Sequence, residues 1–123
     1  MKIIQHAEMP HSNGHYSQCI EHNGLLYLSG QLPIQAADRS IPEGIAAQTE
    51  LALANVERIL LAAGSNRNKV LQMRIYISDI SLWDQVNAVY ADFFKEHKPA
   101  RSIVPTRELH FGCLIEIEAT AIQ

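Results

Sequence analysis

Residues 99–123 read PARSIVPTRELHFGCLIEIEATAIQ. Two strand-like runs in this stretch are separated by a turn that contains Gly112. Arg101 opens the first run, and Glu116 lies in the middle of the otherwise apolar second run. If the two runs pair as a β-hairpin, a fixed cation and a carboxylate face one cleft. The stretch therefore predicts a site that holds a small carboxylate-bearing substrate and acts on it by acid/base chemistry.

The chain before this stretch contains further strand-like runs. They have β-type composition or alternate apolar and polar residues, and they lie at residues 2–6, 16–20, 25–29 and 69–77. The dipeptide Asn23-Gly24 separates the second run from the third. It predicts a hairpin, because both residues tolerate a positive φ.

Two segments have the period of a helix. Residues 44–63 place apolar side chains on one stripe, and Gly64 is suited to end that helix. A second helix is expected after Ser81, which resembles an N-cap with Asp84 three residues later. The predicted order is β-β-β-α-β-α-β-β, in a single α+β domain that spans residues 1–123.

Two helices can cover only one face of such a sheet. The strand at 69–77 is expected to place Val70 and Tyr76 on the other face, and the last strand has apolar residues on both faces. A chain of 123 residues has no further layer to supply. We therefore expect a second copy of the chain to cover this face in a homo-oligomer.

The bulk composition excludes several classes of protein. The net charge is −3 and no basic stripe is visible, so a nucleic-acid partner is not favoured. No apolar run approaches the length of a membrane span, and the N-terminus becomes polar too soon for a signal peptide. Cys19 and Cys113 are expected to be reduced thiols rather than a disulfide. These features predict a cytoplasmic protein with no membrane partner.

The histidines do not form a recognisable metal motif. His11 and His15 are four residues apart, but they lie in a loop with no cysteine or pair of aspartates nearby. We expect no metal site.

A set of short motifs supports a family resemblance. Their order and spacing together are specific, although each alone is weak, and they are Gly14–Gln18 (GHYSQ), Ser29–Pro33 (SGQLP), Gln48, Asn55–Val56, Val86–Asn87, Tyr90, Phe93–Phe94, Pro99–Ser102 (PARS) and Ile115–Ala119 (IEIEA). The set resembles the RidA (YjgF/YER057c/UK114) family across nearly the whole chain. The resemblance implies a chorismate-mutase-like α+β fold, with a mixed six-stranded sheet and two helices on one face. It also implies a homotrimer with a barrel-like core and a cleft at each subunit boundary.

The resemblance further implies an enamine/imine deaminase of the 2-iminobutanoate/2-iminopropanoate type. Such an enzyme hydrolyses reactive intermediates related to 2-aminoacrylate and 2-aminocrotonate to 2-keto acids and ammonia, without a metal or an organic cofactor. Arg101 matches the arginine that binds the substrate carboxylate, and Glu116 matches the carboxylate that holds or activates water. The other positions that match substrate-binding residues are Tyr16, Ser29, Gly30, Asn87 and Ile103.

Four residues depart from the common family pattern: His15, Ile103, Pro105 and His110. They leave the substrate preference and the subgroup open. The same cleft also suits a non-enzymatic module that binds a 2-keto acid or another small carboxylate. Ribonuclease and chaperone activities are a third alternative, which the acidic net charge does not favour for RNA.

Both candidate catalytic residues also have a structural alternative. Arg101 could be a surface cation in an ion pair, because exposed arginines are common. Glu116 could be a structural partner of an arginine at the trimer interface, such as Arg74 or Arg107. Glu118 shares the strand face of Glu116 and is interpreted as structural or solvent-facing.

Overall fold

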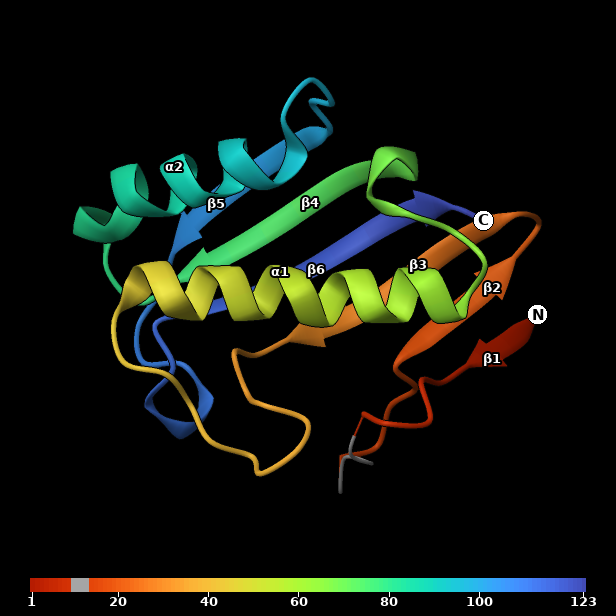
Figure 1. The fold of residues 1–123 in the computed structure, drawn as a ribbon, viewed down its shortest axis with the longest axis horizontal. Helices are drawn as coiled ribbons and strands as arrows, with labels where there is room; N and C mark the ends of the chain where they lie inside the picture. The colour runs from red at the N-terminus through yellow and green to blue at the C-terminus, as the bar shows by residue number, and fades with distance from the viewer. Residues whose placement is uncertain (10–13) are drawn as a thin grey trace.

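The computed structural model describes residues 1–9 and 14–123 (Figure 1). Its strands are β1 (Lys2–Ile4), β2 (Cys19–His22), β3 (Leu25–Gln31), β4 (Val70–Ile77), β5 (Ala100–Pro105) and β6 (Ile115–Ile122). Its helices are α1 (Ile45–Ala62) and α2 (Trp83–Phe94), with short 3₁₀ turns η1 (Arg67–Lys69), η2 (Ile80–Leu82) and η3 (His110–Gly112). The predicted order of strands and helices is confirmed.

The strands form one mixed sheet in the order β1-β2-β3-β6-β4-β5. Only β4 and β5 pair in parallel; the other neighbouring strands are antiparallel. The predicted β2–β3 hairpin is confirmed, with φ of 52° at Asn23 and 80° at Gly24. These two left-handed residues give the tight turn a twist that matches the flanking strands.

The predicted pairing of the last two strands is wrong, because β4 lies between β5 and β6. Helix α2 connects β4 to β5 as a crossover, and a crossover places its two strands side by side in parallel. After β5 the chain crosses to the other side of β4, where β6 pairs with β4 in the antiparallel direction. Arg101 and Glu116 therefore do not meet across a hairpin.

Both helices lie on the same side of the sheet (Figure 1). The core fills the space between the helices and alternate residues of the central strands. Side chains with no measurable exposure there include Leu26, Leu53, Ile59, Met73, Ile75, Ile77, Ile115 and Ile117. The alternation of β4 and β6 directs one residue in two toward the helices, as their period of two requires.

Among residues 1–9 and 14–123, no helix covers the second face of the sheet (Figure 1). Several large apolar side chains on the strands are exposed: Ile3, Tyr27, Leu71, Val104 and Ile122. The placement of Val70 on this face is wrong, because the β4–β6 register shifts between Val70 and Gln72. The irregularity turns Val70 into the core and leaves Leu71 outside instead.

The helix ends follow local turn chemistry. Gly64, at φ 80°, comes after the last turn of α1, as predicted. Ser81 is not the N-cap of α2. Its backbone N–H donates a 2.8 Å hydrogen bond to the Asp79 carboxylate, and Asp79 is the N-cap of the η2 turn. This turn leads directly into α2. Within residues 1–9 and 14–123, no helix is both long and apolar enough to cross a membrane.

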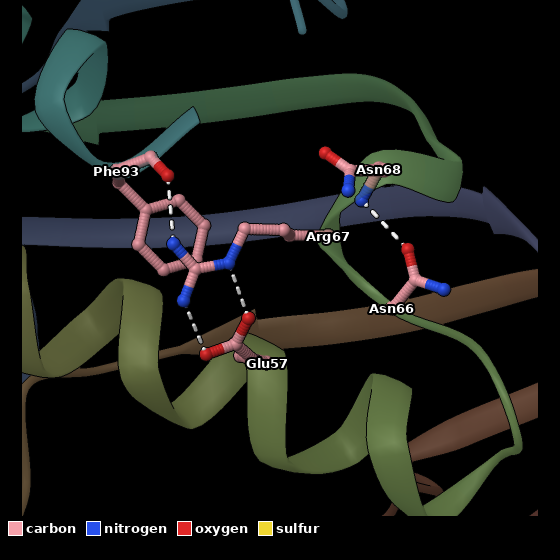
Figure 2. A network of polar contacts seen from close by, with 5 residues as sticks. All are labelled: Glu57, Asn66, Arg67, Asn68 and Phe93. Carbon is pink, nitrogen blue, oxygen red and sulfur yellow. Dashed lines mark hydrogen bonds and ion pairs between the residues drawn. The ribbon is translucent and has the colours of Figure 1, made fainter. Parts of the chain in front are cut away.

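Arg67 connects the two helices and contacts the C-terminal half of α1 (Figure 2). Its guanidinium makes a bidentate contact with the Glu57 carboxylate on α1, with one bond of 2.7 Å. A further 2.7 Å bond goes to the backbone carbonyl of Phe93 on α2, and the guanidinium carbon lies 3.8 Å from the centroid of the Phe93 ring. One planar cation therefore joins α1, η1 and α2.

We expect Arg67→Ala to lower the free energy of unfolding by about 1–2 kcal/mol, because it removes charge-assisted bonds that are only partly exposed. Urea denaturation followed by circular dichroism measures this change. Asp92→Asn is the matched control, since Asp92 faces Lys95 at 3.7 Å in a solvated pair. Equal effects of the two substitutions would contradict the role assigned to Arg67.

Candidate functional site

An open cavity of about 1050 Å³ lies where β3 ends and β6 begins. Four of the seven predicted site residues line it: Tyr16, Ser29, Gly30 and Glu116. Its wall continues through the segment that precedes β2, the loop after β3, and the η3 turn. The cavity therefore gathers residues from several separate stretches of the chain around one carboxylate.

A bulge in β3 shapes the position of that carboxylate. The β3–β6 register shifts between Leu28 and Gln31, which leaves Ser29 and Gly30 outside the regular ladder. A Cβ atom on Gly30 would lie 2.4 Å from the Glu116 Oε2 atom. Only glycine permits this close approach of backbone and carboxylate. The Ser29 hydroxyl donates a 2.6 Å hydrogen bond to the Ser17 carbonyl and so links the bulge to the segment before β2.

We expect Gly30→Ala to lower catalytic efficiency by about 10–100-fold, because the new methyl group displaces the Glu116 carboxylate by roughly an ångström. The collision is with the end of a flexible side chain, so the melting temperature should change little. Steady-state kinetics and thermal unfolding of the same variant test both statements. A Gly30→Ala variant with full activity would show that catalysis does not depend on the observed position of the Glu116 carboxylate.

Two carboxylates on β6 have opposite electrostatic environments. Burial, followed by the charge of Glu118, raises the pKa of Glu116, and the nearby His110 offsets part of this increase. Burial alone would also raise the pKa of Glu118, but hydrogen bonds from Tyr76 and Arg74 outweigh it, so the pKa of Glu118 is lowered. Neighbouring carboxylates whose pKa values move apart are suited to different roles, one in proton transfer and one as a fixed charge.

Glu116 forms no ion pair among the described residues of one chain, and an ion pair with an arginine across a subunit boundary stays a prediction. Arg74 instead bonds to Glu118, with 2.9 Å between Nε and Oε1, and the Tyr76 hydroxyl donates a 2.6 Å bond to the same oxygen. Glu118 is therefore the structural member of the pair, as predicted. The structure gives Glu116 no cation partner among the residues it describes.

Arg101 lies in a separate cluster between β5 and α2. Its Nη1 atom donates a 2.9 Å hydrogen bond to the Asn87 Oδ1 atom. The guanidinium carbon is 4.7 Å from the centroid of the Tyr90 ring and 5.4 Å from that of Trp83. Two aromatic rings and one amide thus orient the guanidinium, and Ile103 packs nearby against the core from the same strand. An ion pair for Arg101 is absent from the described part of the chain.

The sheet separates this cluster from the cavity within one chain. Arg101 pairs in register with Met73, a core residue on the helix side, whereas Glu116 pairs with Tyr76 on the opposite side. Side chains at paired positions point to the same face of a sheet. A single chain consequently presents the candidate residues in two separate groups: Tyr16, Ser29, Gly30 and Glu116 in one, and Asn87, Arg101 and Ile103 in the other.

Sequence reasoning missed two residues of the Arg101 cluster. Trp83, Asn87 and Tyr90 are spaced i, i+4 and i+7, so they share one face of α2. The spacing can be seen in the sequence, but the apolar stripe of the helix overlaps it, so the pattern favours packing roles for the aromatic residues. Phe111 was also missed as a lining residue of the cavity, because a loop has no periodicity that assigns its side chains to a face.

Two buried amides from the motif set hold the loops around the cavity. Gln48 donates to the Pro42 carbonyl at 2.9 Å and accepts from the Leu114 backbone N–H at 2.8 Å. Asn55 donates to the carbonyls of Leu32 and Ile34 at 3.0 and 3.1 Å. These residues position the loop after β3 and the start of β6.

His11 lies outside the described residues, so the structure does not test its pairing with His15. Among the residues that are described, no group of three or more His, Cys, Asp or Glu side chains could hold a metal ion.

The family model described as Endoribonuclease L-PSP matches residues 6–123. The chain belongs to this family, the RidA (YjgF/YER057c/UK114) family. Among its relatives, the 2-iminobutanoate/2-iminopropanoate deaminase of Bos taurus is 37% identical, over 99% of this chain and 90% of its own length. The RutC family protein of Aquifex aeolicus is 37% identical over the full length of both chains.

Solved structures of the RidA family share the fold. The crystal structure of E. coli TdcF with bound serine has a TM-score of 0.94 and 33% identity, and the match covers 100% of this chain and 99% of that one. The predicted α+β fold, with a mixed six-stranded sheet and two helices on one face, is confirmed.

Proposed function

We propose that this protein hydrolyses reactive 2-imino acids, and the enamines in equilibrium with them, to 2-keto acids and ammonia. The observation that carries the proposal is the cavity around Glu116, where burial raises the pKa of a carboxylate that has no cation partner among the described residues. A carboxylate with a raised pKa holds a proton more readily than an ordinary one, which suits it to accept a proton from water and then donate it. The bovine relative named as a deaminase supports the same chemistry.

The mechanism begins with the substrate carboxylate on Arg101. A guanidinium grips a carboxylate through two parallel charge-assisted hydrogen bonds, which fixes the position of the imine carbon. The imine takes a proton from solvent and reacts as the iminium ion. Glu116 accepts a proton from water as the water oxygen attacks the iminium carbon, which gives a neutral carbinolamine. Glu116 then returns this proton to the nitrogen. The C–N bond breaks as the carbinolamine hydroxyl forms the C=O bond and passes its proton to Glu116, ammonia leaves, and Glu116 releases that proton to solvent. The scheme invokes no cofactor, because hydrolysis of a C=N bond needs only proton transfer and water.

The complete site is proposed to form between two copies of the chain in a homotrimer. Arg101 lies on β5, an edge strand with a neighbour on one side only, and exposed edges favour pairing with another chain. The apolar side chains on the open face of the sheet provide a surface that a second copy would bury. In this arrangement Arg101, Asn87 and Ile103 of one subunit face Tyr16, Ser29, Gly30 and Glu116 of the next.

We place the activity in the cytoplasm. Cys19 and Cys113 are both buried free thiols, a state that a reducing compartment preserves.

The direct test supplies 2-iminobutanoate from a threonine dehydratase and follows the formation of 2-oxobutanoate. We expect the purified protein to accelerate that step over the spontaneous hydrolysis. Binding of 2-oxobutanoate without any acceleration would replace the enzyme proposal with a small-carboxylate binding module. The net charge of −3 does not favour the ribonuclease activity that the family description names, because an acidic chain is poorly suited to bind a polyanion.

A further inference from the structure

Phe111 has an unusual backbone conformation for a large side chain. Its φ is 59°, in the left-handed region that glycine occupies without penalty, and it precedes Gly112 at φ 72°. The side chain is 58% exposed, so burial in the core of this chain does not explain why the ring is held there. Strained positions of this kind concentrate at functional sites.

The ring of Phe111 is stacked on that of His110. Their centroids are 3.7 Å apart and the planes differ by 17°. One face of the phenyl ring is therefore covered by the imidazole, and the pair forms a flat, double-layered wall. Both residues belong to the η3 turn. The left-handed backbone of Phe111 and Gly112 in this turn sets the direction in which the wall faces.

This aromatic wall lines the same cavity as Glu116, Gly30 and Tyr16. His110 is close enough to Glu116 for its charge to offset part of the increase in the pKa of that carboxylate. The exposed ring of Tyr16 contributes a further aromatic surface to the cavity. At about 1050 Å³, this open cavity slightly exceeds the range of about 300–1,000 Å³ that holds drug-sized ligands. An imino acid with a methyl or ethyl side chain is much smaller than such ligands.

We propose that the stacked pair of His110 and Phe111 is a specificity determinant that receives the substrate side chain and favours aromatic or branched apolar 2-imino acids. This inference rests on the proposed function and specifies its substrate class. A planar apolar side chain would pack against the free face of Phe111, as aromatic pairs do in offset or edge-to-face arrangements. A methyl group reaches less of that surface and gains less from it.

The experiment compares imines made in situ by an L-amino-acid oxidase from phenylalanine, leucine, alanine and 2-aminobutyrate. Semicarbazide traps each imine, and the enzyme is measured by the loss of semicarbazone. We expect Phe111→Asn to reduce the ratio of kcat/KM for the phenylalanine imine to that for the alanine imine by about 10-fold. Asparagine tolerates the left-handed backbone, so this variant removes the ring without adding strain. Phe111→Tyr keeps the ring and should keep the wild-type ratio.

A matched control separates this effect from general loss of exposed apolar surface. Leu61→Ala alters an apolar side chain on α1 that is 59% exposed and lies outside the cavity, and its ratio should equal that of the wild type. Size-exclusion chromatography follows each variant. An unchanged ratio for Phe111→Asn, or a loss of the oligomer in that variant alone, overturns the specificity role and assigns the pair to packing or to an interface.

A binding measurement keeps the inference distinguishable from the proposed function. Calorimetric titration with phenylpyruvate and with pyruvate does not depend on turnover. If the wild type hydrolyses none of the imines but Phe111→Asn selectively loses affinity for phenylpyruvate, the deaminase proposal fails while the side-chain pocket stands. If the wild type hydrolyses the small imines and prefers no larger side chain, the proposed function stands and the inference fails.

Discussion

Arg101→Ala is expected to lower kcat/KM for 2-iminobutanoate by at least about 10²-fold. The substitution removes two charge-assisted hydrogen bonds to the substrate carboxylate, each worth about 1.5–3 kcal/mol. A loss of about 1.4 kcal/mol in transition-state binding lowers the rate about tenfold. Arg101→Lys keeps the charge but not the planar pair of donors, so its activity should lie between those of the wild type and the alanine variant. Steady-state kinetics with a coupled dehydratase provide the measurement.

The control must separate substrate binding from local packing. Arg101 also contacts Asn87, Tyr90 and Trp83, so its removal could loosen the interface between α2 and β5. The melting temperature and oligomeric state of each variant are compared with those of Arg58→Ala, an arginine on α1 that belongs to neither group of candidate residues. A variant without Arg101 that remains folded and fully active would refute its role as the carboxylate anchor.

Mixed oligomers of two inactive variants are expected to recover activity. If each site combines Arg101 of one subunit with Glu116 of the next, Arg101→Ala and Glu116→Gln are each inactive alone. In a random one-to-one mixture, half of the sites receive an intact Glu116 and half of those an intact Arg101, so about one quarter of the sites are complete. Activity of the unselected mixture should therefore rise from nearly zero to about a quarter of the wild-type value. In purified mixed trimers it should reach about one third, because each mixed trimer contains one complete site out of three.

The outcome distinguishes a shared site from one contained in a single chain. A site within one chain has no complete copy in the mixture, because every subunit carries one of the two substitutions. Differently tagged subunits, purified by both tags in succession, ensure that the assayed oligomers are mixed. Absence of recovery in doubly tagged oligomers would exclude the composite arrangement, while leaving the roles of the two residues to the single-variant kinetics.

Much of the local structure could be predicted from the sequence. Asn23 and Gly24 predicted the β2–β3 turn and Gly64 the end of α1, because both features depend on the φ preferences of one or two residues. The start of α2 was less predictable, because the η2 turn precedes the helix: Asp79 caps η2, and Leu82 occupies the N-cap position of α2 without a side-chain hydrogen bond.

Part of the candidate site could also be predicted. The motif set named Tyr16, Ser29, Gly30 and Glu116, and the cavity brings these four together. The position of Phe111 could not be predicted, because a left-handed conformation at a phenylalanine is imposed by its surroundings rather than by its own preference.

The sequence by itself determined the order of strands and helices, the family, and Arg101 and Glu116 as candidate residues. The tertiary structure decided which strands are neighbours and which face each candidate occupies. The α2 crossover placed β4 between β5 and β6, and the register with β4 directed Arg101 and Glu116 to opposite faces. Strand pairing joins segments far apart in the chain, and side chains alternate with a period of two. One long-range choice of neighbour and register therefore sets the direction of every side chain, which no local pattern of residues encodes.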